Sequence, residues 1–378
     1  MKAAVHFLHS GQGDTILIQG GEEWGIVDAH FVEKLDVRKR AKELLSGVKR
    51  LRFVCITHFD LDHIRGLGDF LREEFSDLDD QGRRTWRIEQ VITPLDAITP
   101  VMLRGLRESA REFDALGEPL LEGDYVAKSA SALLNTLCDM LESSPRPDFP
   151  SLPAGLDLKG PHLDDKRYGM GPWRIVCLGP RDATRELFSD ELRRRYRGDP
   201  PLRELRTLVS QNDTSRVLAL QHAESRCVVL LTGDSTKAEL REVVKQWKCL
   251  GDLKPWSKAP FHIVKVSHHG AEGCHVSELY DAPLCQPERT HAVILSRDED
   301  NHPHPEVIAD LTAKKVPHRV TGSGGVRAPT SHRARGLLPG YGRGLVGGGD
   351  IELVFDGREF VLTGGKLSCH AEGGVARE

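Results

Sequence analysis

Two histidines and two aspartates lie within six residues of this chain, at His58, Asp60, Asp62 and His63. The apolar run at 53–56 comes directly before them and predicts a buried strand that opens into a loop. At strand spacing His58 and Asp60 point the same way, and the other two follow where the chain can turn back. A solvated polar loop is the simpler interpretation. However, placing so many ionisable side chains together costs free energy unless a positive charge balances them. The cluster therefore favours a site for two neighbouring metal ions.

The His-x-Asp-x-Asp-His pattern resembles the signature of the metallo-β-lactamase superfamily, in the variant with Asp at the second histidine position. Other segments are similar to one branch of it, the metallo-hydrolase domain of ComEC/Rec2-type competence proteins. In chain order these segments are Gly11–Asp14, Trp24–Ala29, Leu230–Asp234, Val264–Gly270 and Asn301–Pro305. Their order and rough spacing agree from residue 5 to about 325, with insertions. The resemblance implies an α/β fold, the metallo-β-lactamase αββα four-layer sandwich with helical insertions.

The resemblance also implies two divalent metals with a bridging water or hydroxide between them. His58 and Asp60 would bind the first metal, and Asp62 and His63 the second. Asp at position 60, where many relatives have His, makes that position richer in oxygen. This moves the expected metal from Zn²⁺ towards Mn²⁺ or a mixed pair.

Two later segments would complete this set of ligands. Asp234, at the end of an apolar strand, matches the bridging carboxylate, and Gly233 permits the close turn that it needs. Either His268 or His269 would complete the second metal, and His268 is preferred as the first polar side chain beyond its strand. Taken alone, Asp234 would instead cap a helix, and the two histidines would form a polar turn.

Other residues are expected to orient the ligands or to replace a missing one. The resemblance gives Asp14 and Asp28 an orienting role, although both are also ordinary turn residues. Many relatives have a further histidine before the Gly-Asp strand, and this chain does not. One metal is therefore expected to bind weakly, or to be completed by Asn212, Asp213 or solvent. His9 is a ligand, a proton shuttle or a turn histidine.

Composition excludes several classes of protein. The net charge of −4 argues against a general electrostatic nucleic-acid binder. The 8 cysteines lack CxxC spacing and indicate reduced thiols, so we expect a cytoplasmic protein. No signal peptide or membrane-spanning stretch is predicted, and no membrane partner is expected. The sequence does not indicate an oligomeric state.

We expect one domain over 1–378 with two insertions. Leucines at helical spacing predict helices within 97–170, and these favour a lid or a packing insertion over a separate binding domain. A charged insertion follows at 181–208. Residues 322–349 are rich in Gly and Arg and are typical of a long loop.

The leading hypothesis is a metal-dependent phosphodiesterase or nuclease that acts on nucleic acid or a nucleotide. Asp62 and Asp234 would hold the attacking hydroxide, and His304 would protonate the leaving group or hold a phosphate oxygen. The expected substrate clamp is a set of arginines in the 322–349 loop, Arg327, Arg333, Arg335 and Arg343. Two alternatives remain open: hydrolysis of a lactone, lactam or thioester, and a non-catalytic regulatory module that binds metal.

Overall fold

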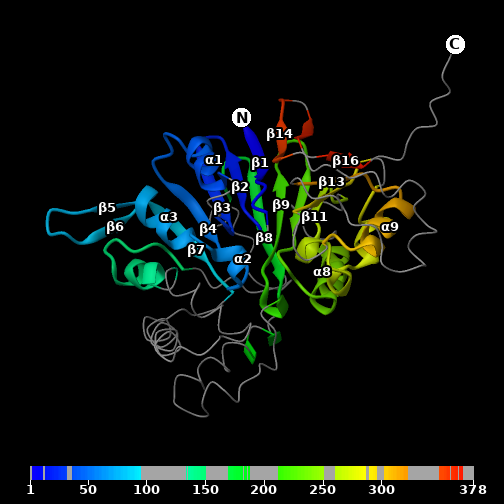
Figure 1. The fold of residues 1–378 in the computed structure, drawn as a ribbon, viewed down its shortest axis with the longest axis horizontal. Coiled ribbons are helices and arrows are strands. Elements are labelled where there is room, and N and C mark those ends of the chain that lie inside the picture. Colours follow the sequence, from blue (N-terminus) through cyan, green and yellow to red (C-terminus); the bar gives the residue numbers. More distant parts are fainter. Residues whose placement is uncertain are drawn as a thin grey trace.

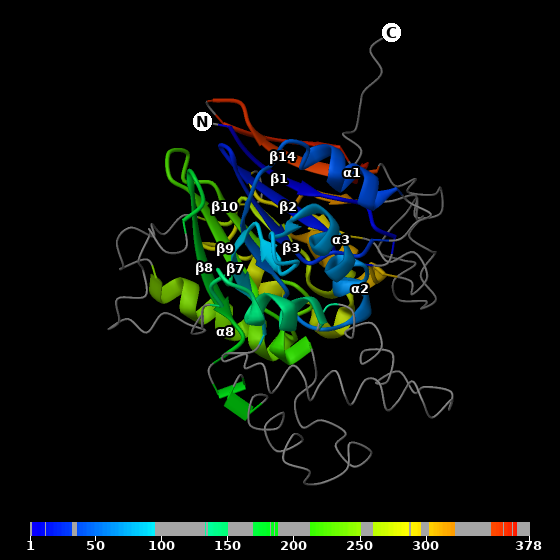
Figure 2. The same ribbon diagram turned by 90° about the vertical axis from the view of Figure 1, so that its left-hand side faces the viewer.

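The structure is a computed structural model. It describes residues 2–11, 13–31, 36–94, 133, 135–149, 169–181, 183–184, 186–187, 212–250, 260–286, 289–295, 302–321, 349–357, 359–364 and 366–368. The described residues form two seven-stranded sheets and one two-stranded sheet. Figure 1 shows the two sheets side by side, with helices on their outer faces, and Figure 2 shows the same ribbon turned by 90°.

The first sheet is built from the N-terminal strands and a C-terminal hairpin. In sheet order its strands are β15 (Phe360–Gly364), β14 (Ile351–Phe355), β1 (Ala3–Phe7), β2 (Ile16–Gly20), β3 (Glu23–Val27), β4 (Leu51–Cys55) and β7 (Ile88–Ile92). Strands β3, β4 and β7 are parallel to one another, and the other neighbouring pairs are antiparallel. Strands β14 and β15 form an antiparallel hairpin around Asp356.

The second sheet comes from the later part of the chain. In sheet order its strands are β16 (Lys366–Ser368), β13 (His318–Val320), β12 (His291–Ile294), β11 (Ile263–Lys265), β10 (Val228–Leu231), β9 (Val217–His222) and β8 (Trp173–Gly179). Strands β10 to β13 run parallel. Five of these strands fall on apolar runs of the sequence, at 173–180, 216–220, 227–231, 261–266 and 292–295.

Alternation along the strands explains how the layers pack. In β4, Phe53 and Cys55 face the core between the sheets, whereas Val54 faces the outer helices. In β10, Val229 faces the core between the sheets, and Leu230 faces the outer helices. A sheet with apolar residues on both faces must be covered on both sides. Helices α1 (Val37–Leu44) and α3 (Leu67–Glu74) cover the first sheet, and α8 (Lys237–Leu250) and α9 (Pro305–Ala313) cover the second. The predicted αββα sandwich is confirmed.

Some elements were not predicted, and some predictions cannot be compared with the structure. The short hairpin of β5 (Ser76–Leu78) and β6 (Arg84–Trp86) and the strand β13 carry too few apolar residues for a periodic signal. Of the 97–170 insertion, residues 135–142 are helical, and Leu137 packs on the first sheet, in agreement with the leucine spacing. Most of 97–170 and of 181–208, and all of 322–348, lie outside the described residues. Within the described ranges, no helix has the length and apolar character needed to cross a membrane.

Candidate metal centre

The candidate site lies where the parallel strands of both sheets end. Asp28 follows β3, the His58–His63 segment follows β4, Asp234 follows β10, and His268 and His269 follow β11. Parallel strands bring their carboxyl ends to one edge of a sheet, so loops distant in the sequence meet there. Because the sheets pack face to face, each contributes one half of the same site.

Backbone hydrogen bonds join these loops. Asp14 N–H donates to the carbonyl of Asp62 at 3.1 Å, and Ala29 N–H donates to that of His63 at 2.7 Å. A third bond links the two sheets, since Arg216 N–H donates to Thr57 O at 3.1 Å. The short helix α2 (Leu61–Ile64) supplies the turn that was expected after the first histidine. The ligand-bearing backbone is therefore fixed by the fold itself.

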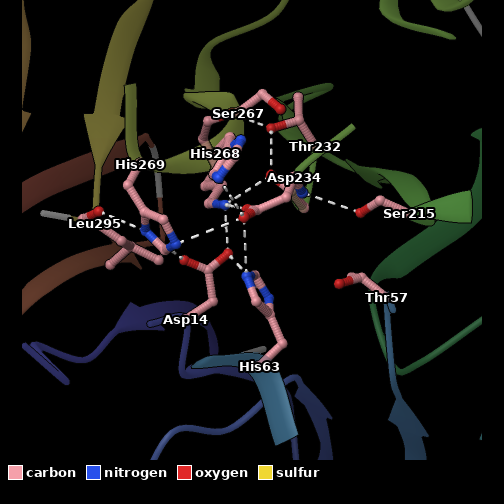
Figure 3. A network of polar contacts seen from close by, with 12 residues as sticks. Asp14, Thr57, His63, Ser215, Thr232, Asp234, Ser267, His268, His269 and Leu295 are labelled. Carbon is pink, nitrogen blue, oxygen red and sulfur yellow. Dashed lines mark hydrogen bonds and ion pairs between the residues drawn. The ribbon is translucent and has the colours of Figure 1, made fainter. Parts of the chain in front are cut away.

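Four side chains from three loops converge within this frame. Asp62, His63, Asp234 and His269 each place one ligand atom so that these atoms lie within 4.8 Å of one another. The Oδ2 of Asp234 is 3.3 Å from His63 Nε2 and 3.6 Å from His269 Nε2. The Oδ2 of Asp62 is 3.3 Å from His269 Nε2. Figure 3 shows His63, His269 and Asp234 pointing towards one another.

The second ring nitrogen of each of these histidines has an acceptor of its own. His63 Nδ1 lies 2.7 Å from Asp28 Oδ2, and His269 Nδ1 lies 2.9 Å from the Leu295 carbonyl. A neutral imidazole that donates through Nδ1 leaves the lone pair of Nε2 free. In its neutral form, each ring would therefore direct an unprotonated nitrogen towards Asp234, as a metal ligand requires.

His268 differs from His269, although it was the preferred ligand. Its Nε2 is 3.8 Å from Asp234 Oδ2, and its side chain is 25% exposed, whereas that of His269 is fully buried. Its Nδ1 faces two donors, the Asn212 amide at 3.4 Å and the Cys274 thiol at 3.3 Å. Accepting there places the proton of the neutral ring on Nε2, where it blocks metal binding. His269, and not His268, groups with Asp62, His63 and Asp234.

The other pair in the motif lies next to this group. His58 Nε2 is 3.4 Å from Asp60 Oδ2, and the His58 and His63 rings are 4.1 Å apart. Thr57 Oγ1 lies 3.0 Å from His58 Nδ1 and donates to Asp28 Oδ2 at 2.6 Å. Thr57 thus connects the two histidines through Asp28. Sequence reasoning overlooked this residue because a threonine at a strand end has no distinctive pattern.

Asp14 and Asp28 lie beside the ligands, as the resemblance implied. Asp28 receives hydrogen bonds from the Thr57 amide and hydroxyl as well as its contact with His63. Asp14 forms an ion pair with the buried ammonium of Lys265 and lies 3.8 Å from His63 Nδ1. Lys265 was also overlooked. In a sequence it is a single charge in an apolar strand, and only the packed sheets show that it is buried.

Two further candidates, Asp213 and His9, have contacts with other parts of the chain. Asp213 accepts a hydrogen bond from Thr236 Oγ1 at 2.7 Å. His9 N–H donates to Asp350 Oδ1 at 2.7 Å, and its carbonyl accepts from Arg40. These contacts do not include a residue of the cluster. Arg327, Arg333, Arg335 and Arg343 lie outside the described residues.

His304 reaches the site through a row of imidazoles. It directly precedes α9, and its Nδ1 accepts the Glu272 N–H at 3.0 Å. Its ring is 4.7 Å from that of His302, which is 5.7 Å from that of His268. With Nδ1 accepting, the neutral His304 ring carries its proton on Nε2.

The backbone at the site is strained. Asp28, His268 and His269 have φ values of 54°, 47° and 54°, in the left-handed region. This conformation is unfavourable for residues with a Cβ, at about 1–3 kcal/mol each, and such residues gather at functional sites.

Two glycines allow the loops to approach closely. A Cβ on Gly13 would lie 1.8 Å from the Asp62 carbonyl oxygen, and one on Gly233 would lie 2.2 Å from Ser215 Oγ. Gly233 also has φ +51°, and the Ser215 hydroxyl accepts the Asp234 N–H at 3.0 Å. The close turn predicted before Asp234 is present.

The site binds protons strongly when it holds no metal. Burial alone would lower the pKa of His63 and of His269, but Asp234 and the neighbouring carboxylates outweigh burial and raise both values. Burial would raise the pKa of Asp62, but His63 and His269 hold it far below its usual range. The pKa of Lys265 is raised because Asp14 and Asp234 outweigh the effect of burial. Such a set of strongly perturbed pKa values is typical of a functional site.

The residues present fit divalent metal ions. The Nε2 atoms of His58 and His63 are buried and have no hydrogen-bond partner among the described residues. Buried polar atoms are nearly always satisfied, and a metal ion shared with the facing carboxylates of Asp60 and Asp234 would satisfy these nitrogens. Imidazole nitrogens with carboxylate oxygens are donors that suit Zn²⁺ or Mn²⁺.

One family model matches part of the chain. Residues 10–75 match the Metallo-beta-lactamase superfamily, a segment that holds Asp14, Asp28 and the whole histidine-aspartate motif. The fold described above is that of this superfamily. The match does not separate its branches, so the similarity to competence proteins stays a prediction. A comparison with curated protein sequences found no match.

Two solved structures are similar to the chain at low identity. A mutant of the CmlA beta-hydroxylase has a TM-score of 0.34 and 11% identity, over 73% of this chain and 37% of that one. A metallo-beta-lactamase family protein from Thermus thermophilus has a TM-score of 0.26 and 16% identity, over 63% of this chain and 64% of that one. The chain thus spans less than two thirds of either protein, and their activities are not transferred to it.

Proposed function

We propose that this protein is a metal-dependent hydrolase of phosphodiester bonds, with nucleic acid or a nucleotide as its substrate. The observation that carries the proposal is the convergence of Asp62, His63, Asp234 and His269, in which Asp234 Oδ2 faces both histidine Nε2 atoms and Asp62 Oδ2 faces that of His269. Two divalent metals bound there would supply a nucleophile at neutral pH and neutralise charge that develops on a phosphate.

The residues of the chain have separate tasks in this proposal. His63, His269 and Asp62 would hold one metal, His58 with Asp60 would hold the other, and Asp234 would be a ligand shared by both. Asp28 and the Leu295 carbonyl keep the His63 and His269 rings in the orientation that points Nε2 inwards. The missing third histidine makes the His58 side the weaker of the two.

A hydrolase also needs a proton for the leaving oxygen. His304 suits this task because its Nδ1 accepts a backbone N–H, which leaves the ring proton on Nε2. His268 presents a proton on its partly exposed side in the same way. We propose that His304 donates this proton, with His302 and His268 lining the path between it and Asp234.

The choice of phosphodiesters over other substrates has its own basis. It is based on the similarity to the competence branch and on the arginines of the 322–349 loop, which would bind phosphate by paired hydrogen bonds. A carbonyl substrate, such as a lactone, lactam or thioester, would need no cluster of arginines.

The proposal is tested on protein purified without chelator. Mass spectrometry of the metal content comes first, followed by parallel assays with bis-p-nitrophenyl phosphate, a chromogenic lactam and a thioester. We expect bound Zn²⁺ or Mn²⁺ and turnover of the phosphodiester. Turnover of the lactam or thioester alone would establish the second hydrolase hypothesis. Metal without any turnover would favour a regulatory metal-binding module.

A further inference from the structure

A lysine is buried at the centre of the candidate metal site, where it interrupts an apolar row. Lys265 ends β11, and its partners on the neighbouring strands are Leu231 and Val293. Both belong to the core between the sheets, as does Ile263 two residues earlier in β11. Residues two apart in a strand face the same side, so Lys265 points into the space between the sheets. Its side chain has 0% exposure.

The ammonium group has three oxygen partners. Lys265 Nζ forms an ion pair with Asp14 Oδ2, donates to the Gly233 carbonyl at 2.8 Å and lies 3.4 Å from Asp234 Oδ1. The two carboxylates are also buried, with side-chain exposures of 1% and 2%. A buried ammonium is tolerated only when it is paired and hydrogen-bonded, and these contacts meet that condition.

The two oxygens of Asp234 therefore have different surroundings. Oδ1 faces Lys265, whereas Oδ2 faces the imidazoles of His63, His269 and His268 at 3.3, 3.6 and 3.8 Å. A free carboxylate could rotate and bind a metal through both oxygens. A cation on one oxygen prevents this rotation and leaves a single oxygen for the metals.

We propose that Lys265 is a positioning residue: it holds Asp234 Oδ1 so that Asp234 meets the metals through Oδ2 alone, while Asp14 holds the ammonium in place. The inference rests on the metal binding assumed in the proposed function. The lysine is present before any metal binds, so the half of the site carried by the second sheet is already arranged in the metal-free protein. The positive charge of Lys265 also offsets part of the negative charge of the clustered carboxylates.

Two variants separate positioning from charge balance. Lys265→Met keeps the length of the side chain and removes its charge. The double variant K265M/D14N removes the lysine together with its partner, and so restores the charge balance without restoring the contact with Asp234. Arg216→Met is the matched control, since Arg216 is also a cation with 0% exposure, and it donates to the Thr93 carbonyl at 2.8 Å.

The main measurement is calorimetric titration of the metal-free variants with MnCl₂ and ZnCl₂. We expect Lys265→Met to lose at least about tenfold in affinity for one metal, in the range found when a residue that orients a ligand is removed. K265M/D14N should regain much of the lost Tm and still bind that metal weakly. Arg216→Met should lose Tm without the same loss of affinity. Wild-type affinity in K265M/D14N would reduce Lys265 to a charge-balancing role and overturn the proposal.

Measurements on the metal-free protein separate this inference from the proposed function. Tm is measured with chelator present for Lys265→Met, Asp234→Asn and their double variant. If Lys265 holds Asp234, the change in Tm of the double variant will be smaller than the sum of the two single changes. Additive changes would contradict the positioning role even if the wild type binds metal. Absence of metal binding in the wild type, together with non-additive changes, would instead contradict the hydrolase proposal and leave the contact between Lys265 and Asp234 established.

Discussion

The Nδ1 atom of His63 lies 2.7 Å from Oδ2 of Asp28, and both side chains are buried. Asp28 is further fixed by the amide and the hydroxyl of Thr57. The contact directs His63 Nε2 towards Asp234, 3.3 Å away. A loop residue of the first sheet thereby orients a ring towards the second sheet.

Replacing Asp28 by Asn is expected to weaken metal binding by about 10- to 100-fold, because an amide is a poorer partner for the ring N–H than a carboxylate. Asn tolerates the left-handed backbone of position 28, so the loop should keep its shape. Asp36→Asn is the matched control, since Asp36 has φ 53° and is exposed. Titration calorimetry with Mn²⁺ measures the effect, and equal weakening in both variants would contradict it.

Replacing Asp62 or Asp234 by Ala is expected to abolish metal-dependent turnover and leave the fold largely intact. Each carboxylate faces His269 within the cluster, and no neighbouring group among the described residues takes the same place. Activity on bis-p-nitrophenyl phosphate and circular dichroism are measured side by side. Asp77→Ala, at a side chain with 62% exposure, should retain full activity. Wild-type turnover in either site variant would remove these residues from the mechanism.

The stability of the metal-free protein is expected to fall as the pH rises above about 6.5. The pKa values of His63 and His269 are raised by the surrounding carboxylates from an ordinary value of 6.5. The stability that this gives is fully present below pH 6.5 and is lost as the pH passes through the raised pKa values. If the folded state binds one proton tenfold more strongly than the unfolded state, the free energy of unfolding increases by about 1.4 kcal/mol. Tm is followed between pH 6 and 9 with chelator, and His269→Gln should flatten the decline.

Metal binding should show the opposite dependence on pH. A metal displaces the protons of both imidazoles, so its affinity rises with pH over the same range. The increase in Tm on adding Mn²⁺ should therefore be larger at pH 8.5 than at pH 6. A constant increase across this range would show that His63 and His269 are not ligands.

Gly13→Ala is expected to destabilise the protein by about 3 kcal/mol and to weaken metal binding at the same time. The added Cβ would lie 1.8 Å from the Asp62 carbonyl oxygen, so the motif loop must move away from the turn before β2. Gly47→Ala is a useful control because no atom lies within 4 Å of a Cβ there, although its φ of +80° carries its own cost. Urea unfolding and metal titration of the two variants check the prediction.

Replacing Arg327, Arg333, Arg335 and Arg343 by Ser is expected to raise KM for a polynucleotide and to flatten its salt dependence. The protein carries a net charge of −4 and must concentrate positive charge locally to attract an anion. Hydrolysis of a small phosphodiester should change much less. Equal KM values and salt slopes in variant and parent would remove this loop from substrate binding.

The sequence predicted the layers of the fold and most of the side chains that meet at the site. An apolar run followed by polar residues is a local sequence pattern that indicates a buried strand and the loop after it. The strand with Phe53 and the loop with the His58 motif could therefore be predicted without tertiary information. The choice of His269 over His268 could not be predicted, because it depends on which ring nitrogen faces the Leu295 carbonyl and which faces Asn212. Lys265 could not be recognised either, since its partner Asp14 is about 250 residues away in the sequence.

The left-handed backbone at His268 and His269 has a consequence for how this protein could change over generations. Glycine or asparagine would occupy both positions at lower conformational cost than histidine. Above the pH at which His269 loses its proton, variants selected only for resistance to heat are therefore expected to exchange these two histidines early. They would lose the second sheet's half of the site while gaining stability. Both histidines would be retained under such selection only if the bound metal stabilises the protein. Directed evolution with and without chelator would therefore show whether the metal maintains the site.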